Sequence, residues 1–392
     1  MNRTTGEYER ITAGGEEVAA FIPYPLPPEN PQLALDTETR TFVHDAEHEL
    51  ARLELASEMV PSLDSFLYGF VRKEAVVSSQ IEGTQATLVD LLTMEAGGFT
   101  DSGPAESDLE EICNYLEAVA YARKQIGRED GLPISMRLLN EAHRRLVKGV
   151  RGADRRPGEI RKSPNWVGGT RPGNAIFVPP PPAALPEVLS GFEKYIHSAD
   201  ELPSIVRVGM AHVQFETIHP YLDGNGRIGR LLITLLLEHW GLLAQPLLYL
   251  SLYFKRHQQE YYDRLGAVRS EGDWEGWTRF FLEGVITIAG EAVTAARELH
   301  SLVAADRGRV VAAPSGTLMA ARLFEQLPEH PVVTIGGARK LLETTKPTAA
   351  KAVKALVDSG VLTEATGRKR DRTFRYTAYL DILRAGTELE AG

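Results

Sequence analysis

Apolar residues return at helical spacing along most of this chain. From Leu33 to Glu95, and again from Ser107 to about Val303, they recur every three or four positions, and runs of β-branched residues are scarce. The pattern predicts a mainly α-helical fold. Residues 1 to about 30 break the pattern, because the prolines of IPYPLPPENP exclude a helix, so we expect this stretch to be extended.

One segment interrupts the second helical region. Residues 157–182, PGEIRKSPNWVGGTRPGNAIFVPPPP, combine glycine-rich turns with two short β-type runs, EIR and AIFV. This combination predicts a β-hairpin flanked by loops. A hairpin that stands alone in a helical domain usually serves as a contact surface, and an irregular surface connection is the alternative interpretation.

A third pattern begins near Ala313. Three helical stretches are followed by VLTEATGRKRDRTFRYTA, in which a basic turn joins two β-type runs. This order predicts a winged helix-turn-helix domain with residues 346–359 as its recognition helix. Residues 334–376 hold ten Lys and Arg against four Asp and Glu, in a chain whose net charge is −10. Such a reversal favours a surface for nucleic-acid phosphates, and a winged helix for dimer or protein contacts is the alternative.

Length and composition indicate a soluble protein of two or three domains, since the chain has 392 residues of which 43% are apolar and 24% charged. The single cysteine, Cys113, excludes an intramolecular disulfide and a thiol cluster for zinc, which favours a reducing, cytoplasmic compartment. The N-terminus has no apolar signal-peptide core. The most apolar stretch, from Leu231, is broken by Glu238 and Pro246, so we expect no membrane span.

The segment with the most chemistry is HPYLDGNGRIGR, residues 219–230. Its glycine-rich turn leads directly into the apolar run LLITLLLEHW, so the backbone N–H groups of GNG lie at a helix N-terminus, where an anion is stabilised. Arg227 and Arg230 are three positions apart, on one face of the first turns. Both can donate hydrogen bonds to phosphate oxygens.

Two further side chains in this segment suit a nucleotide. Asp223 offers the oxygen ligand that magnesium prefers, and that ion normally shares its shell with substrate phosphates. His219 is a histidine, whose titration near neutral pH suits a general base. The segment therefore predicts a site for nucleotide phosphates. A divalent-metal site on His219 and Asp223 is the alternative chemistry, and it lacks a third clear protein ligand nearby.

The same segment resembles the signature of the Fic family, His-x-Phe-x-Asp/Glu-Gly-Asn-Gly/Lys-Arg-x-x-Arg, with Tyr221 where phenylalanine is usual. The resemblance extends through LPPENP, KEAVVSSQIEGTQATLVDLL, the predicted hairpin and LSLYFKRHQQEYYDRL. It implies three domains. They are an N-terminal helical domain with an inhibitory helix (1–105), a Fic catalytic domain with the hairpin as a flap (106–305), and the winged helix-turn-helix domain (312–385).

The resemblance implies an adenylyltransferase, which moves AMP from ATP to a Ser, Thr or Tyr hydroxyl of a target protein and of itself. His219 would be the base, and Asp223 would hold the Mg²⁺ that accompanies ATP. The residues implied to bind ATP are Gly224, Asn225, Gly226, Arg227, Ile228, Gly229 and Arg230, with Tyr261 or Tyr262 at the adenine. The flap, with Ile176 and Phe177, would pair with the backbone of the target.

A glutamate in VVSSQIEGTQA, residues 76–86, stands where a helix should end. The following glycine predicts that end, and a carboxylate is unfavourable at the negative end of a helix dipole unless a cation is near. The stretch resembles the inhibitory motif Ser/Thr-x-x-x-Glu-Gly/Asn, here Ser78, Glu82 and Gly83. The resemblance implies that Glu82 pairs with Arg230 and competes with the γ-phosphate of ATP. An exposed glutamate in a turn is the alternative.

The sequence leaves two other functions open. The same site could remove AMP from a modified protein, with Glu82 orienting a water molecule. The chain could instead be a DNA-binding regulator whose nucleotide domain only senses. The expected partners are ATP and an unidentified target protein. DNA at the winged helix and a homodimer are left open, and no membrane partner is expected.

Overall fold

The computed structural model describes residues 3–59, 63–98, 105–368 and 371–389, and it is mainly helical, as the apolar spacing predicts. The chain divides into two compact units. The first unit contains Met1–Ala51, Cys113–Pro246 and Tyr253–Ile288, and the second contains Arg52–Ile112, Leu247–Leu252 and Ala289–Gly392. These units do not follow the domain boundaries drawn from the resemblance, which stay a prediction.

The first unit combines helices with one two-stranded sheet. Its own elements are β1 (Gly6–Ala13), β2 (Glu16–Pro23), α5 (Met136–Leu146), η1 (Pro172–Asn174), α6 (Leu185–His197), α7 (Ser204–Ile218), α8 (Asn225–His239) and α10 (Gln258–Glu271). Helices that contribute residues to both units are α1 (Thr37–Met59), α4 (Glu106–Ile126), α9 (Ser251–Arg256) and α11 (Trp274–Ala312).

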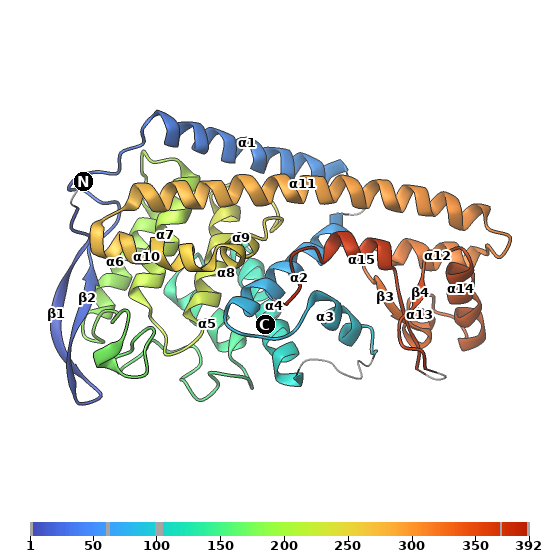
Figure 1. Cartoon of the computed structure of the whole chain (residues 1–392), viewed down its shortest axis with the longest axis horizontal. Helices are drawn as coiled ribbons and strands as arrows, with labels where there is room; N and C mark the ends of the chain where they lie inside the picture. The colour runs from blue at the N-terminus through green and yellow to red at the C-terminus, as the bar shows by residue number, and fades with distance from the viewer. Residues whose placement is uncertain (1–2, 60–62, 99–104, 369–370, 390–392) are drawn as a thin grey trace. The chain divides into compact units, whose positions relative to one another are not determined.

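Helices α7 and α8 form the core of the first unit, where they pack against each other (Figure 1). Most of their residues are buried, as their mostly apolar sequences require. Gly209 of α7 lies against Phe281, and Trp277 Nε1 donates a hydrogen bond to the Gly209 carbonyl at 2.9 Å. The short connection between α7 and α8 therefore starts and ends on enclosed helices.

The N-terminal stretch forms a β-hairpin, which the sequence analysis expected only as extended chain. Strands β1 and β2 pair antiparallel, with Gly6 opposite Pro23 and Ala13 opposite Glu16. Gly14 and Gly15 make the turn at φ +56° and +83°, left-handed values that a two-residue hairpin turn needs and glycine adopts freely.

The predicted hairpin at residues 157–182 is wrong in its extent. One isolated bridge joins Val167 and Phe177, and the segment between them contains η1. The loop closes on itself, because the N–H groups of Thr170 and Arg171 both donate to Asn174 Oδ1 at 3.0 Å. Beyond it, the Val178 carbonyl accepts from Phe21 N–H of β2 at 2.9 Å. A second strand partner is thus supplied by the N-terminal hairpin.

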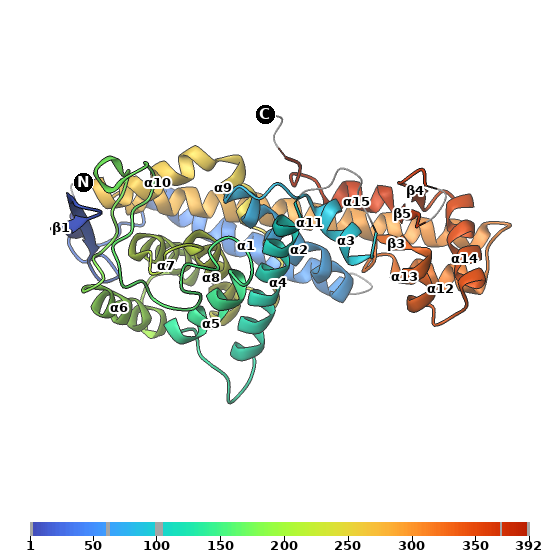
Figure 2. The ribbon, with the colours of Figure 1, turned by 90° about the horizontal axis from the view of Figure 1, so that it is seen from below.

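The second unit contains the helices and strands predicted near the C-terminus. Its elements are α2 (Leu63–Ile81), α3 (Leu88–Glu95), α12 (Leu318–Gln326), β3 (Val332–Thr334), α13 (Ile335–Leu341), α14 (Lys346–Asp358), β4 (Thr363–Glu364), β5 (Thr373–Arg375) and α15 (Thr377–Leu383). The strands form an antiparallel sheet in the order β3-β5-β4, and α12, α13 and α14 pack against one another (Figure 2). Strand β3 adds to the two strands that the sequence predicted.

Helix α2 ends where the sequence predicts. Gly83 adopts φ +98°, its N–H donates to the Gln80 carbonyl at 2.9 Å, and the Thr84 N–H donates to the Ser79 carbonyl at 3.2 Å. These two bonds are those of a Schellman motif, in which Gly83 is the left-handed residue just after the helix. Glu82 is therefore the C-cap residue of α2.

Across the described ranges, no helix combines the length and the apolarity that a membrane crossing requires.

Candidate active site

The connection between α7 and α8 begins at His219 in a strained conformation. His219 has φ +50° and ψ +61°, the left-handed region, and its N–H donates to the Phe215 carbonyl at 2.9 Å. A residue other than glycine held there costs of order 1–3 kcal/mol, and such strain is typical of functional sites. Nδ1 lies 3.3 Å from the Glu216 carbonyl, which only accepts, so this contact requires the proton on Nδ1. Nε2 is then the basic nitrogen.

A buried arginine, Arg161, fixes the backbone of His219. Its Nε donates to the His219 carbonyl at 2.9 Å, and Nη2 donates to the Pro180 carbonyl at 2.5 Å. Its own N–H donates to the Pro220 carbonyl at 2.9 Å. Burial lowers the pKa of Arg161 to about 10, so the guanidinium stays charged at neutral pH. These charged hydrogen bonds offset part of the strain at His219.

Tyr221 is fully buried and has a defined hydroxyl partner. Its hydroxyl donates to Asn140 Oδ1 at 2.9 Å, and its ring stacks on His143 with centroids 3.9 Å apart. His143 Nδ1 accepts from Gly158 N–H at 2.9 Å, so its proton lies on Nε2, which donates to the Asp223 carbonyl at 2.9 Å. Burial lowers the pKa of His143 to about 4, which keeps the ring neutral.

The turn itself is closed by Asn225 and Gly224. The Asn225 side chain accepts from Tyr221 N–H and donates to the Tyr221 carbonyl, both at 2.8 Å. Gly224 has φ +77°, and a Cβ atom there would lie 3.4 Å from His143 Nε2. The side-chain amide of Asn225 therefore shapes the loop.

The N-terminus of α8 presents backbone donors beside positive charge. The first hydrogen bond of the helix joins Ile228 N–H to the Gly224 carbonyl. The N–H groups of residues 225–227 therefore have no acceptor within the helix and point toward its N-terminal end. Arg227 and Arg230 are 0% and 2% exposed. The first turns of α8 thus bring two buried guanidinium groups to the same helix end as these N–H groups.

Gly229 brings α8 close to α7 behind this N-terminus. A Cβ atom on Gly229 would lie 2.1 Å from Glu216 Oε1 and 3.3 Å from His212 Cε1, so a larger residue would displace the Glu216 side chain at this close approach. His212 of α7 donates through Nδ1 to the Gly229 carbonyl at 3.0 Å and accepts through Nε2 from the Tyr261 hydroxyl at 2.8 Å. Burial lowers the pKa of His212 to about 3.

The two tyrosines of α10 differ in accessibility. Tyr261 is 1% exposed, and its ring packs among His212, Phe254 and Trp277. Tyr262 is 45% exposed. Of the pair, Tyr262 is thus the ring that a ligand can reach.

The flap residues also divide into a fixed and an exposed member. Arg269 lies 4.0 Å above the Phe177 ring, and Phe21 contacts the same ring at 6.4 Å between centroids. Ile176 is 85% exposed, and Trp166 and Val167 beside it are more than one third exposed. Phe177 therefore anchors the flap, while the apolar side chain of Ile176 is exposed.

The residues for which the sequence predicts an inhibitory role lie in the second unit. Ser78 is fully buried on α2, and Glu82 is half-buried at the C-cap of that helix. Gly83 supplies the left-handed turn described above.

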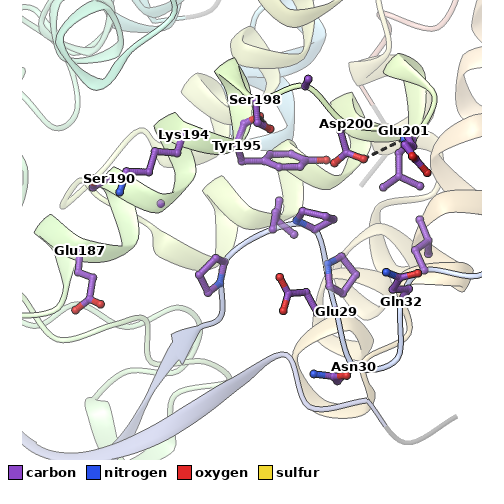
Figure 3. Close-up of a pocket in the computed structure, with 18 residues that line it drawn as sticks. Glu29, Asn30, Gln32, Glu187, Ser190, Lys194, Tyr195, Ser198, Asp200 and Glu201 are labelled. Atoms are coloured by element: carbon purple, nitrogen blue, oxygen red, sulfur yellow. Dashed lines mark hydrogen bonds between the residues drawn. The ribbon is translucent and has the colours of Figure 1, made fainter.

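A separate pocket of about 1240 Å³ lies on the first unit (Figure 3). Residues 25–33 form one wall, and the other is formed by α6 and residues 198–202, with Lys194, Tyr195 and Asp200 among its side chains. None of the predicted site residues lines it. Size alone therefore does not identify the chemical site of this chain.

The fit of a Mg²⁺ ion depends on Asp223 alone. Its carboxylate is 34% exposed, its Oδ1 accepts from Gly224 N–H at 2.6 Å and lies 3.8 Å from Arg227 Nη2. No group of three or more metal-ligating side chains was found among the described residues. One accessible carboxylate fits a magnesium ion whose other ligands are mainly substrate phosphates and water.

Three residues of this site have no motif that marks them in the sequence. Arg161, His143 and Asn140 hold His219, Asp223 and Tyr221 respectively, yet each precedes its partner by 58 to 81 positions in the sequence. Arg161 lies in the β-type run EIR of the flap segment, which was the only signal in the sequence.

Comparisons with known proteins match the same segments. The family described as Fic/DOC family N-terminal matches residues 41–124, and the Fic/DOC family matches residues 133–237. The protein adenylyltransferase Fic of Culex quinquefasciatus is 28% identical over 267 residues, which are 66% of this chain and 50% of that protein. That of Aedes aegypti is 29% identical over 205 residues, 52% and 38%. The chain thus spans half or less of the length of these relatives.

Solved structures show the fold. A Fic family protein from Desulfovibrio desulfuricans G20 has a TM-score of 0.57 at 20% identity, and the match covers 88% of this chain and 97% of that one. Residues 134–508 of Fic-1 from C. elegans have a TM-score of 0.51 at 20% identity, covering 66% and 73%.

Proposed function

Because this chain belongs to the Fic/DOC family, we propose that it is a protein adenylyltransferase that moves AMP from ATP to a hydroxyl of a target protein and of itself. The observation that carries the proposal is the N-terminus of α8. There, the first backbone N–H groups and two buried arginines of α8 follow a histidine that ends α7 and whose backbone is held in a strained conformation. This set provides both an anion site and a base.

In the proposed reaction, His219 Nε2 takes the proton of a Ser, Thr or Tyr hydroxyl as the oxygen attacks the α-phosphorus of ATP. The new O–P bond forms as the bond between the α-phosphorus and the bridging oxygen breaks, and pyrophosphate leaves with its electron pair. The proton passes from His219 to solvent. Positioning supplies much of the rate in such a step, because a bound pair of reactants needs no further ordering.

The N–H groups of Gly224, Asn225 and Gly226 would bind the α- and β-phosphates, with Arg227 on the β-phosphate and Arg230 on the γ-phosphate. Ile228 and Gly229 would keep the helix in place, because Ile228 is buried and Gly229 allows the contact with α7. Asp223 would hold a magnesium ion, which supplies charge neutralisation to the phosphates when ATP is bound. The accessible Tyr262 would contact the adenine.

The flap would dock the target. Ile176 is exposed while Phe177 is fixed under Arg269, so the backbone near residue 176 is held in place for a peptide to pair with it. The hydroxyl of that peptide would then face His219.

Glu82 is the proposed inhibitor of this site. As C-cap of α2 it lies at the negative end of the helix dipole, where a carboxylate gains from a nearby cation. Pairing with Arg230 would satisfy it and would remove the cation that the γ-phosphate needs. Ser78 would hold the buried side of the same helix.

The assay uses ATP labelled at the α-phosphate. Self-labelling should be weak in the native chain and rise on Glu82→Gly, because the competitor of the γ-phosphate is gone. Glu82→Gln is the matched control: it keeps the size of the side chain but removes its charge, so labelling should also rise. Equal labelling of all three proteins would contradict the inhibitory role of Glu82.

Removal of AMP from a modified protein is the second candidate function. The carboxylate of Glu82 favours this reaction because it can orient a water molecule. Incubating an AMP-labelled protein with the native chain separates the two directions. Release of label that is lost on Glu82→Gly would assign removal to the native state, whereas label that stays bound would leave transfer as the reaction.

A further inference from the structure

We propose that α13 and α14 form a binding face for duplex DNA, an activity that does not depend on AMP transfer. The two helices are joined by residues 342–345, and Glu343 in that turn has φ +50°. Thr334 and Thr345 cap the two helices through their hydroxyls. A short turn between two packed helices, followed by a two-stranded ribbon, is the geometry that places the second helix in a major groove.

The outward face of α14 is cationic. Ala349, Ala352, Val353 and Leu356 are buried, whereas Lys346, Lys351 and Lys354 are exposed. At 1.5 Å per residue the three lysines span roughly 12 Å, about the width of the major groove of B-DNA.

Basic side chains continue this face beyond α14. Arg339 and Lys340 are exposed on α13, and Arg372 is exposed before β5. The ion pair of Lys354 with Asp358, at 3.8 Å, is the single one found for the three α14 lysines within the described ranges. This charge remains for phosphates to neutralise.

The charge and shape of the face select the partner. Among the described residues, α13 and α14 carry no exposed large apolar side chain. A protein interface on this face would therefore lack an apolar core. B-form DNA admits a helix into its major groove, whereas the major groove of duplex RNA is too deep and narrow. Duplex DNA is therefore the occupant we infer.

The test measures binding of the full chain to a short fluorescent DNA duplex of random sequence by anisotropy. The logarithm of the association constant should fall steeply between about 50 and 200 mM salt, by about 0.9 per neutralised phosphate on a log–log plot. Lys351→Ala with Lys354→Ala should make that slope shallower by about two. The matched control is Lys124→Ala with Lys194→Ala, two exposed lysines of α4 and α6, which should leave the slope unchanged.

Three results would overturn the proposal. They are a slope near zero, an equal loss in both double variants, and binding of duplex RNA as tight as that of DNA. A salt-insensitive complex with a protein that is lost only on changing Lys351 and Lys354 would assign the face to protein contacts instead.

A second observation concerns α2. Three contacts hold this helix to C-terminal elements of the same unit: Ser65 Oγ donates to Glu329 Oε1 at 3.1 Å, Gly69 lies against Leu383 of α15, and Gln80 Nε2 donates to the Thr387 carbonyl at 2.9 Å. A Cβ atom on Gly69 would lie 2.7 Å from Leu383 Cδ1. We infer that the C-terminal segment controls Glu82 by fixing α2, an inference that rests on the proposed function.

Leu383→Ala tests this inference by loosening α15 on α2. Self-labelling should rise about fivefold or more, the lower range of couplings between sites. Leu356→Ala on α14, an equally buried leucine, should leave labelling unchanged. In the Glu82→Gly chain, Leu383→Ala should add nothing, because the controlled group is already absent.

The outcomes distinguish a failure of this inference from a failure of the proposed function. No rise on Leu383→Ala, or an equal rise in the Glu82→Gly chain, would overturn the inference. No label on Glu82→Gly alone would overturn the proposed function itself.

Discussion

The clamp on His219 gives the sharpest prediction, through Arg161→Lys. Two hydrogen bonds join the Arg161 guanidinium to the carbonyls of His219 and Pro180, at 2.9 and 2.5 Å. Each bond from a charged donor contributes about 1.5–3 kcal/mol. Lysine keeps the positive charge but lacks the planar guanidinium with its several N–H donors, so it can replace at most one of the two bonds. The free energy of unfolding should therefore fall by about 2 kcal/mol.

That loss corresponds to a fall in Tm of about 4–8 °C for a unit of this size. Activity should change as well, because His219 would relax from its strained conformation. In the Glu82→Gly chain, kcat for self-labelling should fall about tenfold, equivalent to about 1.4 kcal/mol. The KM for ATP should stay the same, since α8 keeps its backbone donors and arginines.

The assay is steady-state labelling well below the Tm of the variant, paired with thermal unfolding. Arg171→Lys is the control, because Arg171 forms an exposed pair with Glu16 at 2.7 Å, and such pairs contribute about 0–1 kcal/mol. A lower Tm with unchanged kcat would refute the positioning role and leave Arg161 a purely structural residue. A raised KM with unchanged kcat would move its role to ATP binding.

Three further changes test other parts of the site. Tyr221→Phe should lower the free energy of unfolding by about 1–2 kcal/mol in urea, because Asn140 Oδ1 loses its donor; an unchanged value would mean that water replaces the hydroxyl. Burial lowers the pKa of His143 from 6.5 to about 4. As the pH falls below 6.5, His143 is protonated in the unfolded chain but stays neutral in the folded one. The free energy of unfolding is therefore highest above pH 6.5 and decreases as the pH falls toward 4. Urea unfolding from pH 7 to pH 5 should show that loss, with a shallower slope in His143→Asn; equal slopes would contradict it. Tyr262→Ala should raise the KM for ATP in the Glu82→Gly chain, whereas Tyr261→Phe should lower Tm and leave KM unchanged; the reverse pattern would give the adenine contact to Tyr261.

The sequence predicts the elements that carry their own signals. Helix α2 ends at Glu82 and Gly83 because glycine there takes φ +98°, a local preference that one residue reveals. The loop of residues 219–224 is likewise local, since its glycine and asparagine close it within a few positions.

Contacts between distant residues were not predictable in this way. The side-chain partners of Tyr221, Asp223 and His219 come from residues 140, 143 and 161, and no local pattern marks them. The predicted hairpin of the flap is wrong for the same reason. Val178 pairs with Phe21 of the N-terminal hairpin, a tertiary contact, in place of the expected second strand. Burial of Tyr261 against His212 also depends on a neighbour that is remote in sequence.

Intact-mass spectrometry after incubation with ATP and Mg²⁺ tests the central claim most directly. The account predicts an added AMP on the Glu82→Gly chain, little or none on the native chain, and none on the chain that carries both Glu82→Gly and His219→Ala. An added phosphate in place of AMP, or an AMP adduct that persists without His219, would contradict it.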